Sequence, residues 1–301
     1  MRIVFNDNKG PCPCGSGKDI PDCCLRGNGS LLPEPARTIV KAPVTGFSHE
    51  RCYASDLCDC STKITAEHYF SHVVAKRLNQ NKRLVVGGMS YLKDGEERVV
   101  SPASAASNIL CDRHNRALSE LDTVGGNFFN ALMLLDRAEM IPTKKAMLFN
   151  GHDIERWFLK MLCGYLASNE TIMDGEIRRW RAPISWLDVL YGKKDFADDF
   201  GLYYNQQIGI VTKHRAGLAI APITDMSGCQ VGGAAIEINS FKFLISLTPK
   251  HLISNEILAD YVYRPCGIYT SMNGSQVYTM MGWDMQTDDG IWRLQLPDSV
   301  Y

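Results

Sequence analysis

Cysteines gather in the first third of the chain, and their spacing is the strongest chemical signal in the sequence. Eight of the eleven lie at or before Cys111, in close groups. The first nine residues lack the pattern of a secretory signal, so we expect a cytoplasmic protein with reduced thiols. Close cysteine pairs are then better interpreted as zinc ligands than as disulfides. The scattered Cys163, Cys229 and Cys266 are interpreted as ordinary buried thiols.

Two cysteine pairs near the N-terminus can supply a complete zinc shell. Tetrahedral zinc takes four soft ligands, and Gly15 and Gly17 permit a tight turn between the pairs. The ligands are Cys12, Cys14, Cys23 and Cys24. Residues 11–24 resemble the SEC-C motif, a small zinc-binding appendage. This resemblance implies a closed structural zinc and a module that contacts a protein or nucleic-acid partner.

A second group of possible ligands is spread over a longer stretch. Cys111 and His114 form a Cys-x2-His pair at an expected helix start, with further cysteines upstream. Cys52, Cys111 and His114 are the preferred ligands of a second structural zinc. Cys58 and Cys60 compete for the fourth position, and Cys58 is preferred because Cys60 lies closer to the strand that carries His68. In the alternative interpretation, His114 is catalytic.

Glu67, His68 and Asn115 complete the chemical constellation. With the cysteine pairs, they resemble the HNH, or ββα-metal, endonucleases over residues 52–122. The resemblance implies that His68 is the general base, since imidazole accepts protons near neutral pH. It also implies that Glu67 and Asn115 hold Mg²⁺ or Mn²⁺ beside the scissile phosphate. Glu67 stands where the family has Asp, and His114 replaces a cysteine.

No further catalytic histidine or asparagine is obvious after Asn115, and Asp122 is a candidate for the missing metal ligand. His72, four residues after His68, is interpreted as a surface or packing residue.

The expected partner is nucleic acid, with DNA as the preferred choice. Six cations near the predicted site are expected to contact phosphate, with a solvated surface as the alternative. They are Lys76, Arg77, Lys82, Arg83, Arg113 and Arg116.

The expected fold class is α+β, in four segments. They are a zinc knot at 1–29, a linker at 30–46, the nuclease domain at 47–126 and a C-terminal domain at 127–301. In the nuclease domain, the pattern predicts a strand near Ile64, a helix or turn at 69–78 and a hairpin around residues 93–95. In the C-terminal domain it predicts helices at 127–136 and 154–166, then an antiparallel sheet formed by residues 208–211, 217–223, 234–247 and 276–281.

The composition of the chain excludes some classes of function but does not identify one. The net charge of -1 argues against indiscriminate binding to nucleic acid, and no apolar run approaches the roughly 18 residues needed to cross a membrane. Two other classes of function remain. One is a zinc-braced nucleic-acid-binding or adaptor module without cleavage, and the other is an interaction protein that binds a partner through the zinc knot or the C-terminal domain. By analogy with nucleases that carry extra domains, a role in phage defence is a further hypothesis.

Overall fold

The computed structural model places the chain in two compact units that are not contiguous in sequence. It describes residues 2–5, 10–68, 71–79, 84–87, 92–93, 96–138, 144–168, 171–173, 176–205, 217–224, 230–239, 241–249, 260–272, 274–284 and 291–294. Unit 1 comprises Met1–Pro35, Asn127–Glu155 and Ala197–Tyr301, and unit 2 comprises Ala36–Gly126 and Arg156–Phe196. The two units therefore differ from the four consecutive segments predicted from the sequence. The chain passes from one unit to the other within two helices, between Gly126 and Asn127 and between Glu155 and Arg156.

The two long helices, α3 and α4, contain those boundaries. They are α3 (Ser119–Arg137) and α4 (Gly151–Ser168). Both helices were predicted from their apolar periodicity, and the structure confirms them. Helix α4 is buried on all sides from Gly151 to Gly164, so it is a core helix and not an amphipathic surface helix.

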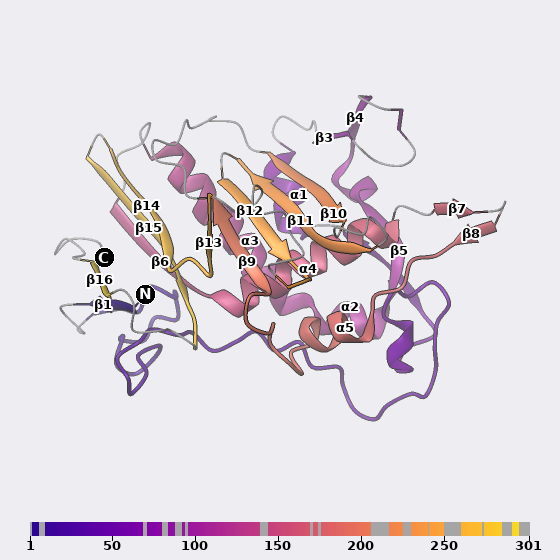
Figure 1. Ribbon diagram of the computed structural model, residues 1–301, viewed down its shortest axis with the longest axis horizontal. Helices are drawn as coiled ribbons and strands as arrows, with labels where there is room; N and C mark the ends of the chain where they lie inside the picture. The colour runs from indigo at the N-terminus through magenta and orange to yellow at the C-terminus, as the bar shows by residue number, and fades with distance from the viewer. Residues whose placement is uncertain are drawn as a thin grey trace. The chain divides into compact units, whose positions relative to one another are not determined.

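Besides parts of α3 and α4, unit 2 contains short helices and strands, among them α1, α2, α5 and β5, which are labelled in Figure 1. Strand β2 pairs with β5, with Ile64 opposite Cys111 and His68 opposite Ala106. A second antiparallel pair, β3 with β4, confirms the predicted hairpin, although its turn residues 94–95 lie outside the described residues. The elements are η1 (Ser55–Leu57), β2 (Ile64–His68), α1 (His72–Leu78), β3 (Leu84–Gly87), β4 (Glu97–Val100), η3 (Pro102–Ala105), β5 (Ala106–Cys111), α2 (Asp112–Ala117), β7 (Thr171–Met173), β8 (Glu176–Arg178) and α5 (Ile184–Leu190).

Unit 1 contains a five-stranded antiparallel sheet in the order β10-β11-β12-β9-β13 (Figure 1). Phe128 of α3 packs edge-to-face against Phe243 of β12, with ring centroids 5.9 Å apart, so α3 lies against this sheet. The strands of the unit are β1 (Arg2–Phe5), β6 (Lys144–Asn150), β9 (Gly201–Asn205), β10 (Leu218–Thr224), β11 (Val231–Ile238), β12 (Phe241–Ser246), β13 (Tyr261–Tyr263), β14 (Gly267–Met272), β15 (Ser275–Gly282) and β16 (Ile291–Leu294).

The prediction of a purely antiparallel C-terminal sheet is wrong in one part. Strand β15 pairs antiparallel with β14 but parallel with β6, which was not predicted as a strand. The predicted strands at 217–223, 234–247 and 276–281 are confirmed as β10, β11 with β12, and β15. The predicted strand at 208–211 lies outside the described residues. Within the described ranges, no helix has both the length and the apolar character that a membrane span requires.

Candidate functional site

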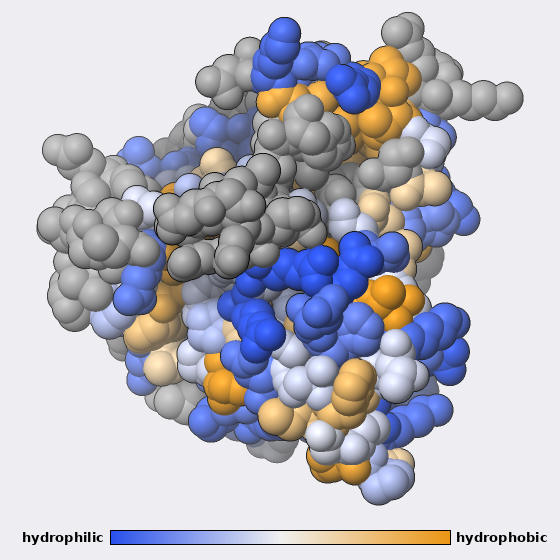
Figure 2. Space-filling model, turned by 90° about the vertical axis from the view of Figure 1, so that its right-hand side faces the viewer, coloured by the Kyte–Doolittle hydropathy of each residue, from blue (hydrophilic) through white to orange (hydrophobic). Residues whose placement is uncertain are grey.

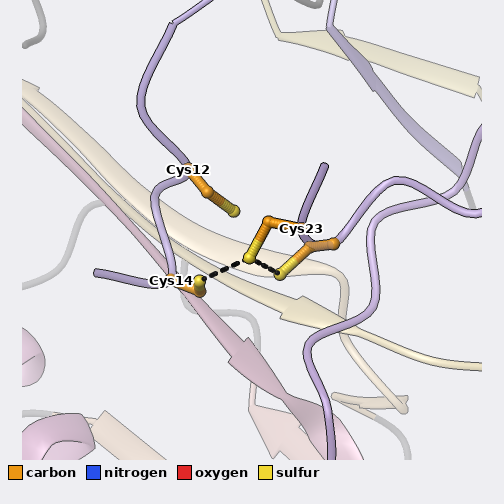
Figure 3. A group of neighbouring side chains, drawn as sticks. Cys12, Cys14 and Cys23 are labelled. Carbon is orange, nitrogen blue, oxygen red and sulfur yellow. Dashed lines mark hydrogen bonds between the residues drawn. The ribbon is translucent and has the colours of Figure 1, made fainter. Parts of the chain in front are cut away.

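The first cysteine group lies in unit 1, in a loop that turns back on itself. Gly15 and Gly17 adopt positive φ angles of 82° and 77°, which a residue with a side chain would tolerate poorly. The turn brings four sulfur atoms within 4.8 Å of one another: Cys12, Cys14, Cys23 and Cys24. Figure 3 shows the labelled Cys12, Cys14 and Cys23 pointing toward a common centre.

Sulfur spacing in this group matches a tetrahedral zinc shell. Cys14 Sγ lies 3.5 Å from Cys23 Sγ, and Cys23 Sγ lies 3.6 Å from Cys24 Sγ. Sulfurs bound to one tetrahedral zinc at 2.3 Å are about 3.8 Å apart, so the donor set and its spacing fit the ion. The loop also packs on the sheet of β6, β14 and β15 through Leu148, and Leu148 N–H donates to Pro13 O at 2.9 Å. All four ligands come from protein, which fits a structural site.

The second group lies in unit 2 and is more deeply buried. Its members are Cys52, Cys60, Cys111 and His114, each at most 1% exposed. His114 Nδ1 lies 3.5 Å from the Cys52 sulfur, 3.7 Å from that of Cys60 and 3.3 Å from that of Cys111. Three thiols around one imidazole nitrogen at these distances fit a Cys3His zinc site. Hydrogen bonds from Cys52 and Cys60 lower the pKa of the Cys111 thiol, whereas the same contacts with Cys111 raise the pKa values of Cys52 and Cys60.

Secondary structure explains why these four residues meet. Cys111 ends β5 and caps α2, and His114 follows in the first turn of that helix. The loop that precedes β2 is fixed by backbone bonds from Tyr53 N to Ile109 O and from Cys60 N to Phe47 O. A zinc bound here would therefore fasten this loop to the junction of β5 and α2.

The preference for Cys58 as the fourth ligand is wrong. Cys58 ends the short helix η1 with a left-handed φ of 51°, and its exposed thiol lies 3.5 Å from Ser48 Oγ. The turn at Cys58 sends the chain inward, so that the sulfur two residues later enters the cluster. Cys60 is 1% exposed and takes the fourth position. His114 belongs to the cluster, as the preferred interpretation predicted.

Glu67 lies in a buried charge cluster of unit 2. Its side chain is 5% exposed, and its carboxylate forms an ion pair with Lys160 Nζ. Lys160 also donates to Asp122 Oδ1 at 2.6 Å. Burial raises the pKa of Glu67, and Lys160 opposes that shift. Both carboxylates that were considered as metal ligands therefore share a lysine.

Asn115 has a different partner. Its Nδ2 donates to Thr65 Oγ1 at 2.9 Å, near the start of β2, whereas His68 ends that strand. Three residues of strand separate the two positions by about 10 Å of backbone. The structure therefore brings Asn115 to the start of β2, whereas Glu67 is paired with Lys160 and His68 lies beside His72.

The expected Mg²⁺ or Mn²⁺ site does not fit these contacts. A catalytic cation needs oxygen ligands and open positions for water and phosphate. The carboxylate of Glu67 faces a buried ammonium, and the amide of Asn115 is held by Thr65. Among the described histidines, cysteines and carboxylates, the two cysteine groups are the clusters with metal-binding geometry.

His68 is partly exposed and lies beside another histidine. His68 Nε2 is 3.3 Å from His72 Nδ1, and the ring centroids are 4.8 Å apart. Burial lowers the pKa of His68, and the positive charges of neighbouring His72 and Lys160 lower it further. The neutral imidazole is therefore favoured at neutral pH. His72 lies on the exposed face of α1, as expected for a surface residue.

The six predicted phosphate contacts have different surroundings. Lys76 and Arg77 are exposed in the last turn of α1, and Arg116 is 72% exposed beside Asp112. Arg113 is only 16% exposed and is engaged by Asp59 at 3.1 Å. Lys82 and Arg83 lie outside the described residues.

Lys160 is the residue that the sequence analysis missed. It lies in α4, far along the chain from β2, in a helix that is buried from Gly151 to Gly164. Asp153, Glu155 and Arg156 lie in the same helix, so the sequence did not single out Lys160, and only the burial of α4 shows that its charge must be paired.

No protein-family model matches this chain, and no curated protein or solved structure resembles it significantly.

Proposed function

We propose that the protein is an HNH-type nuclease that hydrolyses phosphodiester bonds in nucleic acid, with His68 as its general base. The observation that carries this proposal is the Cys3His cluster at the junction of β5 and α2. A zinc at this place would brace an antiparallel strand pair against a helix and leave His68 at the accessible end of β2. The order of strand, strand and helix around such a brace supports the resemblance drawn from the sequence.

His68 has the properties of a proton acceptor. Its pKa is lowered, so the imidazole stays neutral at neutral pH and can take a proton from water that attacks a phosphodiester. The backbone hydrogen bond at Pro102 raises its pKa only partly and helps to orient the ring. The proposed proton transfer depends on His68 and not on the divalent metal site expected from Glu67 and Asn115.

Nucleic acid, and DNA before RNA, is the proposed substrate. Lys76, Arg77 and Arg116 are exposed cations of unit 2, and exposed Lys63 pairs only loosely with Asp112 at 3.7 Å. Such side chains bind phosphate without reading sequence. Figure 2 shows both hydrophilic and apolar residues exposed on one face of the molecule. The zinc knot and the rest of unit 1 are proposed to select the target or a protein partner.

One observation favours a second candidate, a zinc-braced nucleic-acid-binding or adaptor module without cleavage. Glu67, the acidic residue of the proposed motif, is buried and paired with Lys160. A carboxylate in that state cannot hold an accessible cation. In this candidate the same cysteine clusters support binding alone.

Cleavage assays distinguish the two candidates. The zinc-loaded chain is incubated with labelled single- and double-stranded DNA and RNA, with and without Mg²⁺ or Mn²⁺. The nuclease proposal predicts cleavage that falls at least about 100-fold in His68→Ala, the usual loss when a general base is removed. His49→Ala is the matched control and should keep the activity, because the His49 ring contacts Phe47 and accepts a hydrogen bond from Arg51 N but does not lie beside His68. If wild type and His68→Ala fail to cleave and both still shift DNA, the binding module is the correct function.

A further inference from the structure

Lys160 lies at the centre of a charge cluster that connects three elements of unit 2. Glu67 comes from β2, Asp122 from α3 and Lys160 from α4. The lysine side chain is 2% exposed, that of Glu67 5% and that of Asp122 28%. Its ammonium contacts both carboxylates, at 2.6 Å for Asp122 Oδ1.

An ammonium in this position needs both partners. Moving a charge out of water costs several kcal/mol unless counter-charges and hydrogen bonds compensate for it. Burial alone would lower the pKa of Lys160, but Glu67 and Asp122 outweigh burial and raise it. The lysine therefore stays charged, and both carboxylate groups are oriented toward it.

Two carboxylates that converge on one point form the usual beginning of a divalent-cation site. Here that point is filled by Lys160 Nζ. We propose that Lys160 is the cation that Glu67 and Asp122 share, and that it closes this carboxylate pair to divalent metal ions. Lys160 is a positioning residue in this arrangement, since it holds Glu67 and with it the end of β2 that carries His68.

This inference concerns the charge cluster itself and does not depend on cleavage. It replaces the sequence interpretation of Glu67 as a metal ligand. It also makes a positive prediction, because removing the ammonium while keeping an unbranched side chain leaves two carboxylates with no cation. Lys160→Met should convert the pair into a site for Mn²⁺, a divalent cation that carboxylate oxygens suit.

Mn²⁺ titration of the zinc-loaded full chain, followed by the electron paramagnetic resonance signal of free Mn²⁺, tests the proposal. Wild type and Glu67→Gln should bind Mn²⁺ equally, whatever other sites they have. Lys160→Met should gain one site with at least tenfold tighter binding than wild type, and the double variant Glu67→Gln/Lys160→Met should lose that site. Thermal unfolding should show the same pattern, with Mn²⁺ raising the melting temperature of Lys160→Met alone.

Lys194→Met is the matched control, because it removes a lysine that pairs with Asp188 at 3.1 Å but is 70% exposed. It should bind Mn²⁺ as wild type does. A folded Lys160→Met that gains no site overturns the proposal. If Lys160→Met does not fold, the comparison of wild type with Glu67→Gln decides, since loss of a Mn²⁺ site in Glu67→Gln alone shows that Glu67 holds a metal beside Lys160. A chain that cleaves no nucleic acid can still pass or fail each of these tests.

Discussion

Substitution of Cys60, compared with substitution of Cys58, tests the proposed ligand set of the second cysteine group most directly. Cys60 is 1% exposed with its sulfur 3.7 Å from His114 Nδ1, whereas the Cys58 thiol is exposed and outside the cluster. Structural zinc contributes about 10–16 kcal/mol through four ligands, so one ligand is worth about 2.5–4 kcal/mol. At 1.4 kcal/mol for each factor of ten, Cys60→Ser should weaken zinc binding by about 100- to 1,000-fold.

Zinc content by mass spectrometry and competition with a chromogenic chelator measure this effect. Wild type and Cys58→Ser should hold two zincs per chain and release them at the same chelator concentration. Cys60→Ser should release one zinc at a much lower chelator concentration and unfold at a lower temperature. If Cys58→Ser loses the second zinc while Cys60→Ser keeps it, the path of the chain through the η1 turn is not as described.

Three further changes test other parts of the two units. Gly125→Ala in α3 should destabilise unit 2 by about 1–3 kcal/mol in chemical denaturation, because the new Cβ would overlap the Trp157 indole; an open helix position would instead gain about 1 kcal/mol. Asn115→Ala should cost about 1 kcal/mol in the same assay, through loss of the bond to Thr65. In unit 1, Glu155 and Asp284 raise the pKa of His152 despite its burial, so its protonation stabilises the fold fully below about pH 6.5. That contribution should disappear as pH rises through the folded-state pKa, and Asp284→Asn should flatten the profile.

Local spacing predicted most members of the two cysteine groups, because residues a few positions apart on a tight turn or at a helix start lie close together. Cys111 and His114 are three residues apart at the start of α2, and the sequence identified both. The choice between Cys58 and Cys60 depended on one left-handed residue. Cysteine rarely adopts that conformation, so no propensity rule predicts it. The preference for Cys58 was therefore wrong because of the direction of the backbone at this turn, and not because of the type of ligand.

Long helices and alternating strands were also predictable, since their apolar periodicity extends over many residues. Strand β6 was missed because Lys144 and Lys145 begin it and it pairs in parallel with a distant partner, β15. Parallel pairing is set by contacts remote in sequence, which no local pattern contains. The same limit explains why the two units interleave along the chain while the predicted segments were linear.

Burial decides what the acidic residue of the proposed motif can do, and the sequence does not contain burial directly. Glu67 next to His68 has the pattern of a metal ligand beside a general base. In the structure α4 brings an ammonium to it, and a fully enclosed carboxylate with a lysine partner has no open position to offer a metal. The sequence motif identifies Glu67 and His68 as candidate reactive groups, whereas Lys160 of α4 determines that the carboxylate of Glu67 is already paired. Because α4 supplies that lysine, Glu67 is not free to hold a metal, and the nuclease proposal depends on His68. His68→Ala tests whether His68 acts in cleavage, and Lys160→Met tests whether the lysine keeps metal away from Glu67 and Asp122.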